Sequence, residues 1–216
     1  MNKDILLWVS LLIILSNIYL LGTSRLGAMI RGIAFQGILL SVLPLLLPNA
    51  EIHNIHIMIL CMLSVLVKGY FIPNFLEKII KNVKVQRELN PYVGYFSSVL
   101  FGLIVSYSSF YLLKKMPFFA LVISPVHAST AMASVLIGTF LVASRRNVLA
   151  QIIGFLVFEN AGFILGVSVA STQPIFIEIG ILFDLLAGVV IMGTSMKLIH
   201  MHFKTLSVHS LERLNK

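Results

Sequence analysis

The sequence contains little cysteine and little charge. Cys61 is the one cysteine, so the chain forms no internal disulfide, and a single thiolate cannot complete a zinc or iron–sulfur ligand set. Metal-based redox chemistry within this chain is therefore not expected. Charged residues make up 11% of the sequence and hydrophobic residues 58%. Soluble domains contain about a quarter charged residues, so this composition excludes an ordinary soluble domain.

Continuous apolar runs dominate the chain in place of short alternating segments. A helical run of about 20 residues crosses a hydrocarbon core of about 30 Å. We therefore predict an all-α, polytopic transmembrane helical bundle. Its seven candidate spans are residues 4–23, 28–47, 53–75, 92–113, 125–143, 147–170 and 175–201. The first is expected to be a retained helix, because its nearly neutral lead of Lys3 and Asp4 is atypical of a cleaved signal peptide.

Lysine and arginine are unequally divided between the connections. With seven spans, one side would carry only Lys3, Lys114 and Lys115. The other would carry Arg25, Arg31, Lys78, Lys81, Lys84, Arg87, Arg145, Arg146, Lys204, Arg213 and Lys216. The positive-inside rule then predicts an amino terminus outside and a carboxyl terminus in the cytoplasm. The formal net charge of +8 follows from this bias and suits anionic lipids, so nucleic-acid binding is not expected.

A polar stretch divides the spans into two groups. The predicted parts are an amino-terminal three-helix part (1–76), a basic cytoplasmic loop (77–91), a four-helix part (92–201) and a cytoplasmic tail (202–216). Four cations of the loop are spaced at helical intervals: Lys78, Lys81, Lys84 and Arg87. The stretch either lies on the membrane surface, meets a cytoplasmic partner, or is a solvated connection.

Three ionisable residues are expected at membrane depth. Glu159 and Asp184 lie within the sixth and seventh spans, and Lys68 lies within the third. An acid at the centre of a membrane helix costs about 2.5–3.5 kcal/mol, so it usually faces a partner, a cavity or a proton path. Since an approaching ammonium changes the proton affinity of a carboxylate, these residues are candidate proton-transfer groups. Alternatively, the acids make interhelical hydrogen bonds, and Lys68 extends to the membrane interface.

Glycines lie beside both acids at helical spacing. They are Gly162 and Gly166 near Glu159, and Gly180 and Gly188 on either side of Asp184. Small residues allow another helix to approach closely or leave room for water.

Other polar residues give weaker signals. His127, in the first turn of the fifth span, either extends a proton path or is an interfacial histidine. Glu178 is expected near the outer boundary, and Gln36 is expected to make an interhelical hydrogen bond. No acid or thiol accompanies the histidines at ligand spacing, so no metal site is predicted.

The stretch RRNVLAQIIGFLVFENA, residues 145–161, resembles the three-helix K subunit of respiratory complex I. That family has a similar Arg-Asn-Leu opening and an Asn-Ala pair, here Asn160 and Ala161. Residues 177–197 resemble its last helix, where Asp184 stands in place of a membrane glutamate. The first membrane glutamate of the K subunit corresponds to Leu156, and the acid is displaced by one helical turn to Glu159.

The length, the seven spans and the segment KGYFIP at residues 68–73 are more similar to component E of hydrogenase-4. This resemblance implies a non-redox, non-catalytic membrane subunit of a complex-I-like group 4 NiFe hydrogenase, of the formate hydrogenlyase type. Such a subunit would lie in the inner membrane of a prokaryote. The NiFe centre and iron–sulfur clusters would reside on partner subunits, and antiporter-like subunits would dock beside this chain.

In such an assembly, Glu159, Asp184 and Lys68 would belong to a path that moves H⁺ or Na⁺, lined by His127, Glu178 and Asn160. Two alternatives stay open. The C subunit of multisubunit cation/proton antiporters also resembles the K subunit and needs no redox partner, and a purely structural scaffold is the other.

Overall fold

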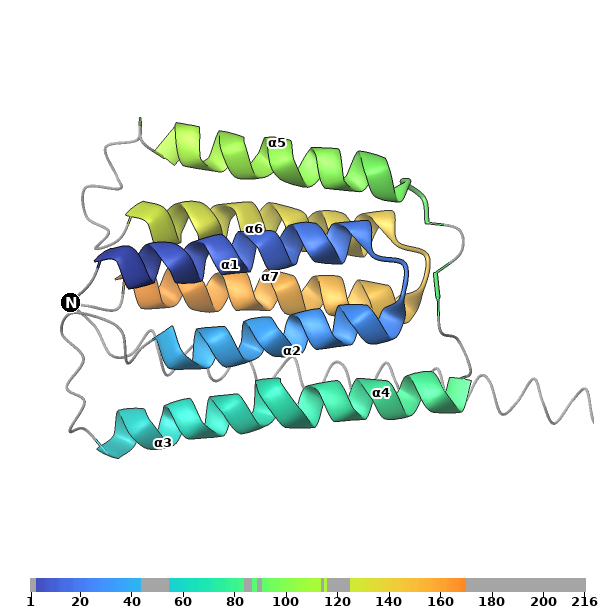
Figure 1. The fold of residues 1–216 in the computed structure, drawn as a ribbon, viewed down its shortest axis with the longest axis horizontal. Coiled ribbons are helices and arrows are strands. Elements are labelled where there is room, and N and C mark those ends of the chain that lie inside the picture. Colours follow the sequence, from blue (N-terminus) through green and yellow to red (C-terminus); the bar gives the residue numbers. More distant parts are fainter. Residues whose placement is uncertain are drawn as a thin grey trace, which may run out of the picture.

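The structure, a computed structural model, describes residues 3–43, 55–83, 87–88, 91–113, 115 and 125–169. Within them, the regular secondary structure is helical, with one isolated bridge between Arg25 and Arg87. The predicted seventh span, with Asp184 and Glu178, and the predicted tail lie outside the described residues. Figure 1 shows the described helices lying roughly parallel in an elongated bundle.

Helices occupy each predicted span that falls within the described residues. Their bounds are α1 Lys3–Gly22, α2 Leu26–Val42, α3 Ile55–Ser64, η2 Val65–Phe71, α4 Ile72–Val83, α5 Tyr95–Leu113, α6 Pro125–Ser144 and α7 Val148–Val169. In the part of the chain that the structure describes, three stretches are long and apolar enough to cross a membrane: Tyr95–Leu113, Pro125–Ser144 and Val148–Gly166. Leu7–Gly22 and Leu26–Val42 are apolar but shorter.

The third predicted span continues beyond its expected end. Elements α3, η2 and α4 follow one another without a break from Ile55 to Val83. The last part is amphipathic: Leu76 and Ile79 are buried, while Lys78 and Lys81 are exposed. An apolar stripe on one side supports a helix at the surface of a bundle. Residues 77–83, which we expected in a loop, are therefore helical.

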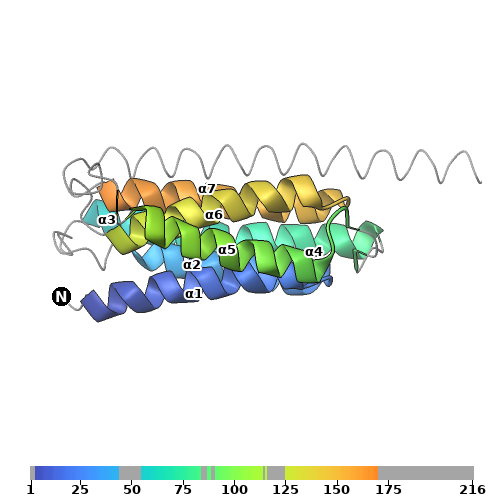
Figure 2. The ribbon, with the colours of Figure 1, turned by 90° about the horizontal axis from the view of Figure 1, so that it is seen from above.

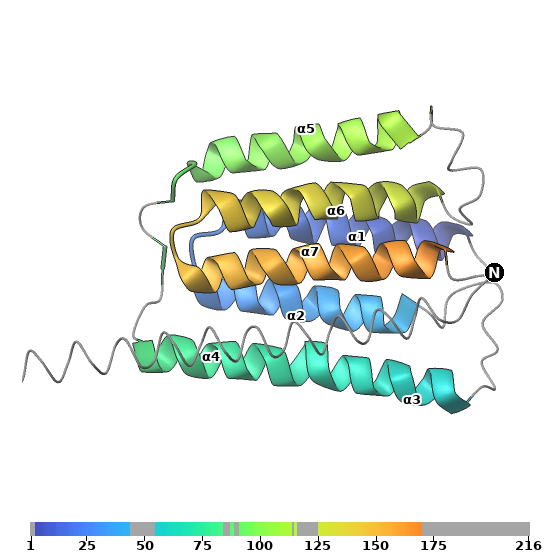
Figure 3. The ribbon, with the colours of Figure 1, turned by 180° about the vertical axis from the view of Figure 1, so that it is seen from behind.

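Among the described helices, α6 and α7 pack most extensively against each other. A Cβ atom added to Gly138 would lie 2.5 Å from the Phe158 backbone nitrogen, and one added to Gly154 would lie 2.7 Å from Leu141 Cβ. Small residues allow such backbone approach between membrane helices. Figure 3 shows the two helices side by side, with α1 and α2 behind them.

Helix α5 packs at an edge of the bundle. Ser98, Gly102 and Val105 on one face are buried, whereas Phe96 and Tyr107 on the opposite face are exposed. Figure 2, seen from above, places α1 and α7 on opposite sides of the bundle. The exposed aromatic face of α5 is typical of a surface that meets lipid or another subunit.

One end of the bundle collects basic residues. The α1–α2 turn, the α6–α7 turn, the end of α4 and the start of α5 all lie there (Figure 1). We call it the basic end, defined by Arg25, Lys81, Arg87, Arg145 and Arg146. These residues were predicted to share one side of the membrane, and the fold brings them to the same end.

Candidate functional site

Lys68 is buried at the centre of the long helix, within the π-helical element η2. Its side chain is 6% exposed. The Lys68 Nζ donates a hydrogen bond to Asn160 Oδ1 at 3.1 Å and lies 4.8 Å from the centroid of the Phe163 ring. The lysine therefore points towards α7, so the alternative in which it extends to the interface is wrong. Short π-helical turns within α-helices are frequent at functional sites.

Gly37 allows Lys68 to occupy this position. A Cβ atom at Gly37 would lie 2.6 Å from Lys68 Cβ and 3.1 Å from the Lys68 carbonyl oxygen. A real Cβ atom does not approach another carbon so closely. Helix α2 therefore packs directly against the backbone of η2, and any larger residue would move Lys68.

Glu159 lies on α7 next to Asn160, the partner of Lys68. Glu159 is 7% exposed, and both Asn160 and Phe163 are buried with it. Leu156, about one turn earlier on α7, belongs to the main hydrophobic core with Ile153. The structure thus brings Lys68 to the stretch of α7 that carries the predicted Glu159 and Asn160.

Gly162 leaves open space beside α7, which is one of the two arrangements expected for the glycines near Glu159. Gly162 is exposed, and a Cβ added there would have no neighbour within 4 Å. Among the glycines of α7 whose surroundings are described, Gly154 makes the close approach, two turns earlier.

A second polar cluster joins α1, α2 and α6. The Gln36 Nε2 donates to Asn17 Oδ1 at 2.8 Å, and the Asn17 Nδ2 donates to Ser134 Oγ at 2.7 Å. All three side chains are buried. The interhelical hydrogen bond predicted for Gln36 is confirmed. Asn17 was missed, although an amide within the otherwise apolar run of α1 was an available signal.

His127 lies inside the bundle. It is 1% exposed, and its Nδ1 lies 2.6 Å from Ser10 Oγ, a hydrogen bond that joins α6 to α1. Which of the two atoms donates depends on the histidine tautomer. The ring is covered by α1, and both roles expected of His127, a place on a proton path and a position at the depth of the membrane interface, stay predictions.

The two polar clusters meet across α2. Gln36 of the second cluster directly precedes Gly37, which packs against Lys68 of the first. Polar side chains thus follow one another laterally from α6 through α1 and α2 to η2 and α7. Ser41 and Ser64, 2.9 Å apart, add a further polar contact between α2 and α3. Polar groups at this depth are costly in an apolar bundle unless they are paired or have a function.

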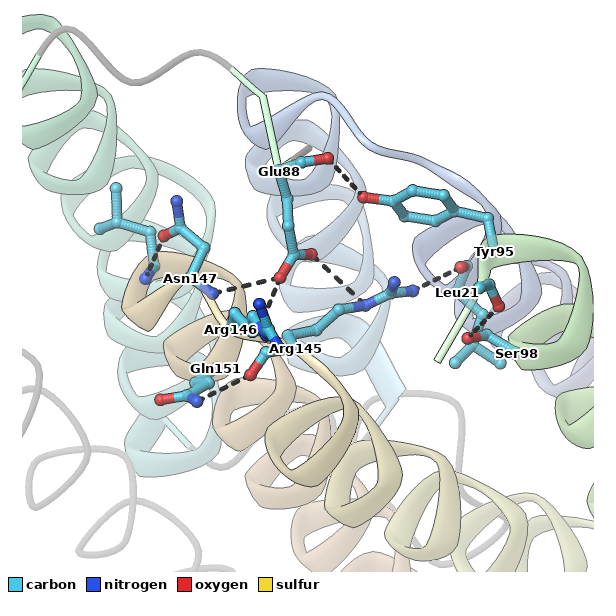
Figure 4. A network of polar contacts seen from close by, with 10 residues as sticks. Leu21, Glu88, Tyr95, Ser98, Arg145, Arg146, Asn147 and Gln151 are labelled. Atoms are coloured by element: carbon cyan, nitrogen blue, oxygen red, sulfur yellow. Dashed lines mark hydrogen bonds and ion pairs between the residues drawn. The ribbon is translucent and has the colours of Figure 1, made fainter. Parts of the chain in front are cut away.

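A third polar group, at the basic end, was not predicted (Figure 4). The Oε1 of Glu88 accepts hydrogen bonds from the backbone N–H groups of Arg146 at 2.8 Å and Asn147 at 3.1 Å. Its Oε2 lies 3.7 Å from the Nε of Arg145. The Arg145 Nη2 donates to the Leu21 carbonyl at 2.6 Å, and the guanidinium lies 4.6 Å from the Tyr95 ring centroid.

These contacts, which we call the Glu88–Arg145 clamp, hold four segments together: the end of α1, residues 87–88, the start of α5 and the start of α7. Arg145 is 0% exposed. Burial lowers the pKa of its guanidinium and Glu88 opposes that shift, but arginine keeps its charge in proteins. The clamp is a structural feature, since it ties loops together and leaves no room for a ligand around the buried guanidinium.

Among the described residues, no three His, Cys, Asp or Glu side chains gather as metal ligands. The described polar groups inside the bundle are an amine, a carboxylate, amides, hydroxyls and an imidazole. Such groups exchange protons or bind cations.

Apolar helices with polar side chains buried between them define a helical membrane protein. The chain is 25% identical over 183 residues to an uncharacterized protein of Mycobacterium tuberculosis. The aligned region covers 84% of this chain and 82% of that protein. It is 31% identical over 86 residues to hydrogenase-4 component E of Escherichia coli, and this aligned region covers 40% of each chain. Component E of Shigella flexneri matches to the same extent. No protein-family profile and no solved structure matches the chain.

Proposed function

We propose that this chain is a non-redox membrane subunit of a membrane-bound NiFe hydrogenase assembly, and that its buried polar residues form part of a path for H⁺ or Na⁺. The similarity to hydrogenase-4 component E supports the type of assembly. The contact between Lys68 and Asn160, next to Glu159, is the observation that carries the ion path. The NiFe centre and iron–sulfur clusters belong, in this proposal, to partner subunits.

The chemistry of the path rests on a cation and a carboxylate carried near one another inside the bundle. Lys68 reaches the part of α7 that holds Glu159. A change in the distance between an ammonium and a carboxylate changes the proton affinity of both. Because Lys68 sits on a π-helical turn, a local change of that turn would alter this distance without moving the whole helix.

The lateral arrangement gives the path a direction. From Lys68 the polar side chains continue past Gly37 to Gln36, Asn17 and Ser134. Amides and hydroxyls relay protons only with water or reorientation, so they line the path and do not store charge. His127 lies farther along α1 and α6 and completes the polar line on that side. In the proposal, Asp184 and Glu178 extend the path from the predicted seventh span.

The proposed topology has seven spans, with the amino terminus outside and the basic end in the cytoplasm. The gathering of Arg25, Arg87, Arg145 and Arg146 at one end supports it through the positive-inside rule. The proposed location is the cytoplasmic membrane of a prokaryote. Antiporter-like subunits would dock on exposed apolar faces such as that of α5.

Purification of the full chain in mild detergent, followed by mass spectrometry of its partners, tests the assembly. We expect NiFe and iron–sulfur subunits together with antiporter-like membrane subunits. Antiporter subunits alone, with cation-dependent antiport in vesicles, would assign the chain to a cation/proton antiporter instead. The chain would be a structural scaffold if the complex needed it for assembly but moved ions normally in the Glu159→Gln and Lys68→Met variants.

A further inference from the structure

A cavity of about 490 Å³ lies at the basic end, outside the polar clusters described above. Four cations and one carboxylate contribute to its wall, together with Gly27, Ala28 and Ile80. The charged residues are Arg25, Arg31, Lys81, Arg87 and Glu77. All four cations are exposed. The volume falls within the range of about 300–1,000 Å³ that is usual for small-molecule sites.

The fold holds two of these arginines opposite each other. Arg25 and Arg87 form an isolated antiparallel bridge, and the Glu88 N–H donates to the Ser24 carbonyl at 3.0 Å beside it. Directly opposed residues in such a bridge project to the same face, and opposed like charges are destabilising. Among the described residues, neither arginine has a side-chain hydrogen bond or ion pair to offset this repulsion. A bound anion would offset it.

Arg31 adds a cation at greater depth. It lies in the second turn of α2, about 8 Å along the helix from its start at 1.5 Å per residue. Lys81 faces the same cavity from α4. The cations thus surround the cavity from the α1–α2 turn, α2, α4 and residue 87, an arrangement that suits a phosphate group with several oxygen atoms.

The exposed face of α2 that follows Arg31 towards the carboxyl end of the helix is apolar. Phe35, Ile38 and Val42 follow Arg31 at helical spacing and are exposed. A ligand that fills the cationic cavity and continues along this face must be anionic at one end and apolar at the other. A soluble acidic peptide would not use the apolar face.

We propose that the cavity binds the phosphate-bearing headgroup of an anionic phospholipid, whose acyl chains lie along the exposed face of α2. Basic pockets between membrane helices bind such headgroups in other proteins. The site does not depend on the hydrogenase assembly, because all of its residues belong to this chain. It would fix the depth of α2 and α4 in the bilayer and stabilise the opposed arginines.

Native mass spectrometry of the full chain in detergent tests the site, with titrations of phosphatidylglycerol, phosphatidylcholine and inorganic phosphate. We expect phosphatidylglycerol to bind more tightly than phosphatidylcholine. Each of Arg31→Gln and Arg87→Gln should weaken phosphatidylglycerol binding about 5-fold, since a basic residue near an anionic surface contributes about 1 kcal/mol. The matched control is Lys78→Gln, an exposed lysine of α4 that does not line the cavity, and it should bind like the unmodified chain.

Equal phosphatidylglycerol affinity in the unmodified chain and both arginine variants would overturn the proposal, provided that circular dichroism shows equal helix content. Inorganic phosphate that displaces phosphatidylglycerol at equal concentration would show a site for the free anion. A polyglutamate peptide that displaces the lipid and loses affinity in the same variants would assign the cavity to an acidic protein segment. Both results contradict the lipid assignment.

Discussion

At the scale of single residues, the position of Lys68 depends on what is missing at Gly37. The lysine is buried against α7 because α2 carries no side chain where the backbone of η2 passes. Burial of an amine is tolerated when it has polar and aromatic partners, and Asn160 and Phe163 supply both. Gly37 therefore determines where the Lys68 ammonium lies, although the glycine itself has no polar side chain.

Gly37→Ala tests this dependence. The added methyl group would meet Lys68 Cβ at 2.6 Å, and overpacking of this kind costs typically about 1–3 kcal/mol. We expect a lower thermal unfolding midpoint of the purified chain in detergent. Gly27→Ala, on the same helix, has no atom within 4 Å of the new Cβ and should be neutral or stabilising. If both variants unfolded at the same temperature, the close packing of α2 on η2 would be wrong.

At the scale of elements, two kinds of contact act at different places in the bundle. Helices α6 and α7 meet through Gly138 and Gly154, so their attraction comes from close backbone packing. The loops at the basic end are held by the buried Glu88–Arg145 clamp. Packing sets the spacing of the helices along their length, and the clamp sets their register at one end.

Gly138→Ala should separate α6 from α7. The new Cβ would lie 2.5 Å from the Phe158 nitrogen, and a backbone atom of a packed helix cannot move aside alone. We expect a loss of about 1–3 kcal/mol in unfolding free energy, as for other overpacked sites, measured by denaturant titration in detergent micelles. Thr139→Ala is the control, because Thr139 is exposed and its hydroxyl bonds to the Val135 carbonyl of its own helix. A larger loss in the control than in Gly138→Ala would contradict the role of the glycine.

Removal of one partner from the Glu88–Arg145 clamp should be more damaging than removal of both. Glu88→Gln leaves the buried Arg145 without its opposing charge, a change that costs about 3–5 kcal/mol in comparable buried pairs. The double variant Glu88→Gln with Arg145→Met removes both charges and should recover part of that loss. A double-mutant cycle of unfolding free energies measures the coupling, and strictly additive losses would show that the two residues do not interact.

At the scale of the whole molecule, the sequence predicted most of the described helices and several of the polar residues buried between them. Apolar runs of membrane length predicted the described helices, and single polar residues within them identified Lys68, Glu159 and Gln36. The Glu88–Arg145 clamp was not predicted, because both residues lie in polar connections where charge is usual and the sequence does not show which charges are buried. The extension of the long helix to Val83 was missed because hydropathy identifies only the apolar part of a helix. The residues that follow are amphipathic and continue the helix with charged side chains on one face.

The same limit applies to contacts between distant segments. Asn160 became a partner of Lys68 only once η2 was placed against α7, 92 residues away in the chain. Hydrogen bonds such as that between Ser10 and His127 likewise depend on which helices are neighbours. Helical periodicity shows on which face of its helix a residue lies, but it does not show which other helix packs against that face.

We propose that the buried charges of this chain move ions within a larger redox assembly. The most direct measurement is proton or sodium uptake per H₂ formed, in membrane vesicles that contain the intact complex with Glu159→Gln. Glutamine keeps the size of the side chain and removes its charge and its titration. We expect a complex of unchanged composition whose redox turnover continues while its ion uptake per H₂ falls. Unchanged ion uptake per H₂ in Glu159→Gln, and also in Lys68→Met, would contradict it.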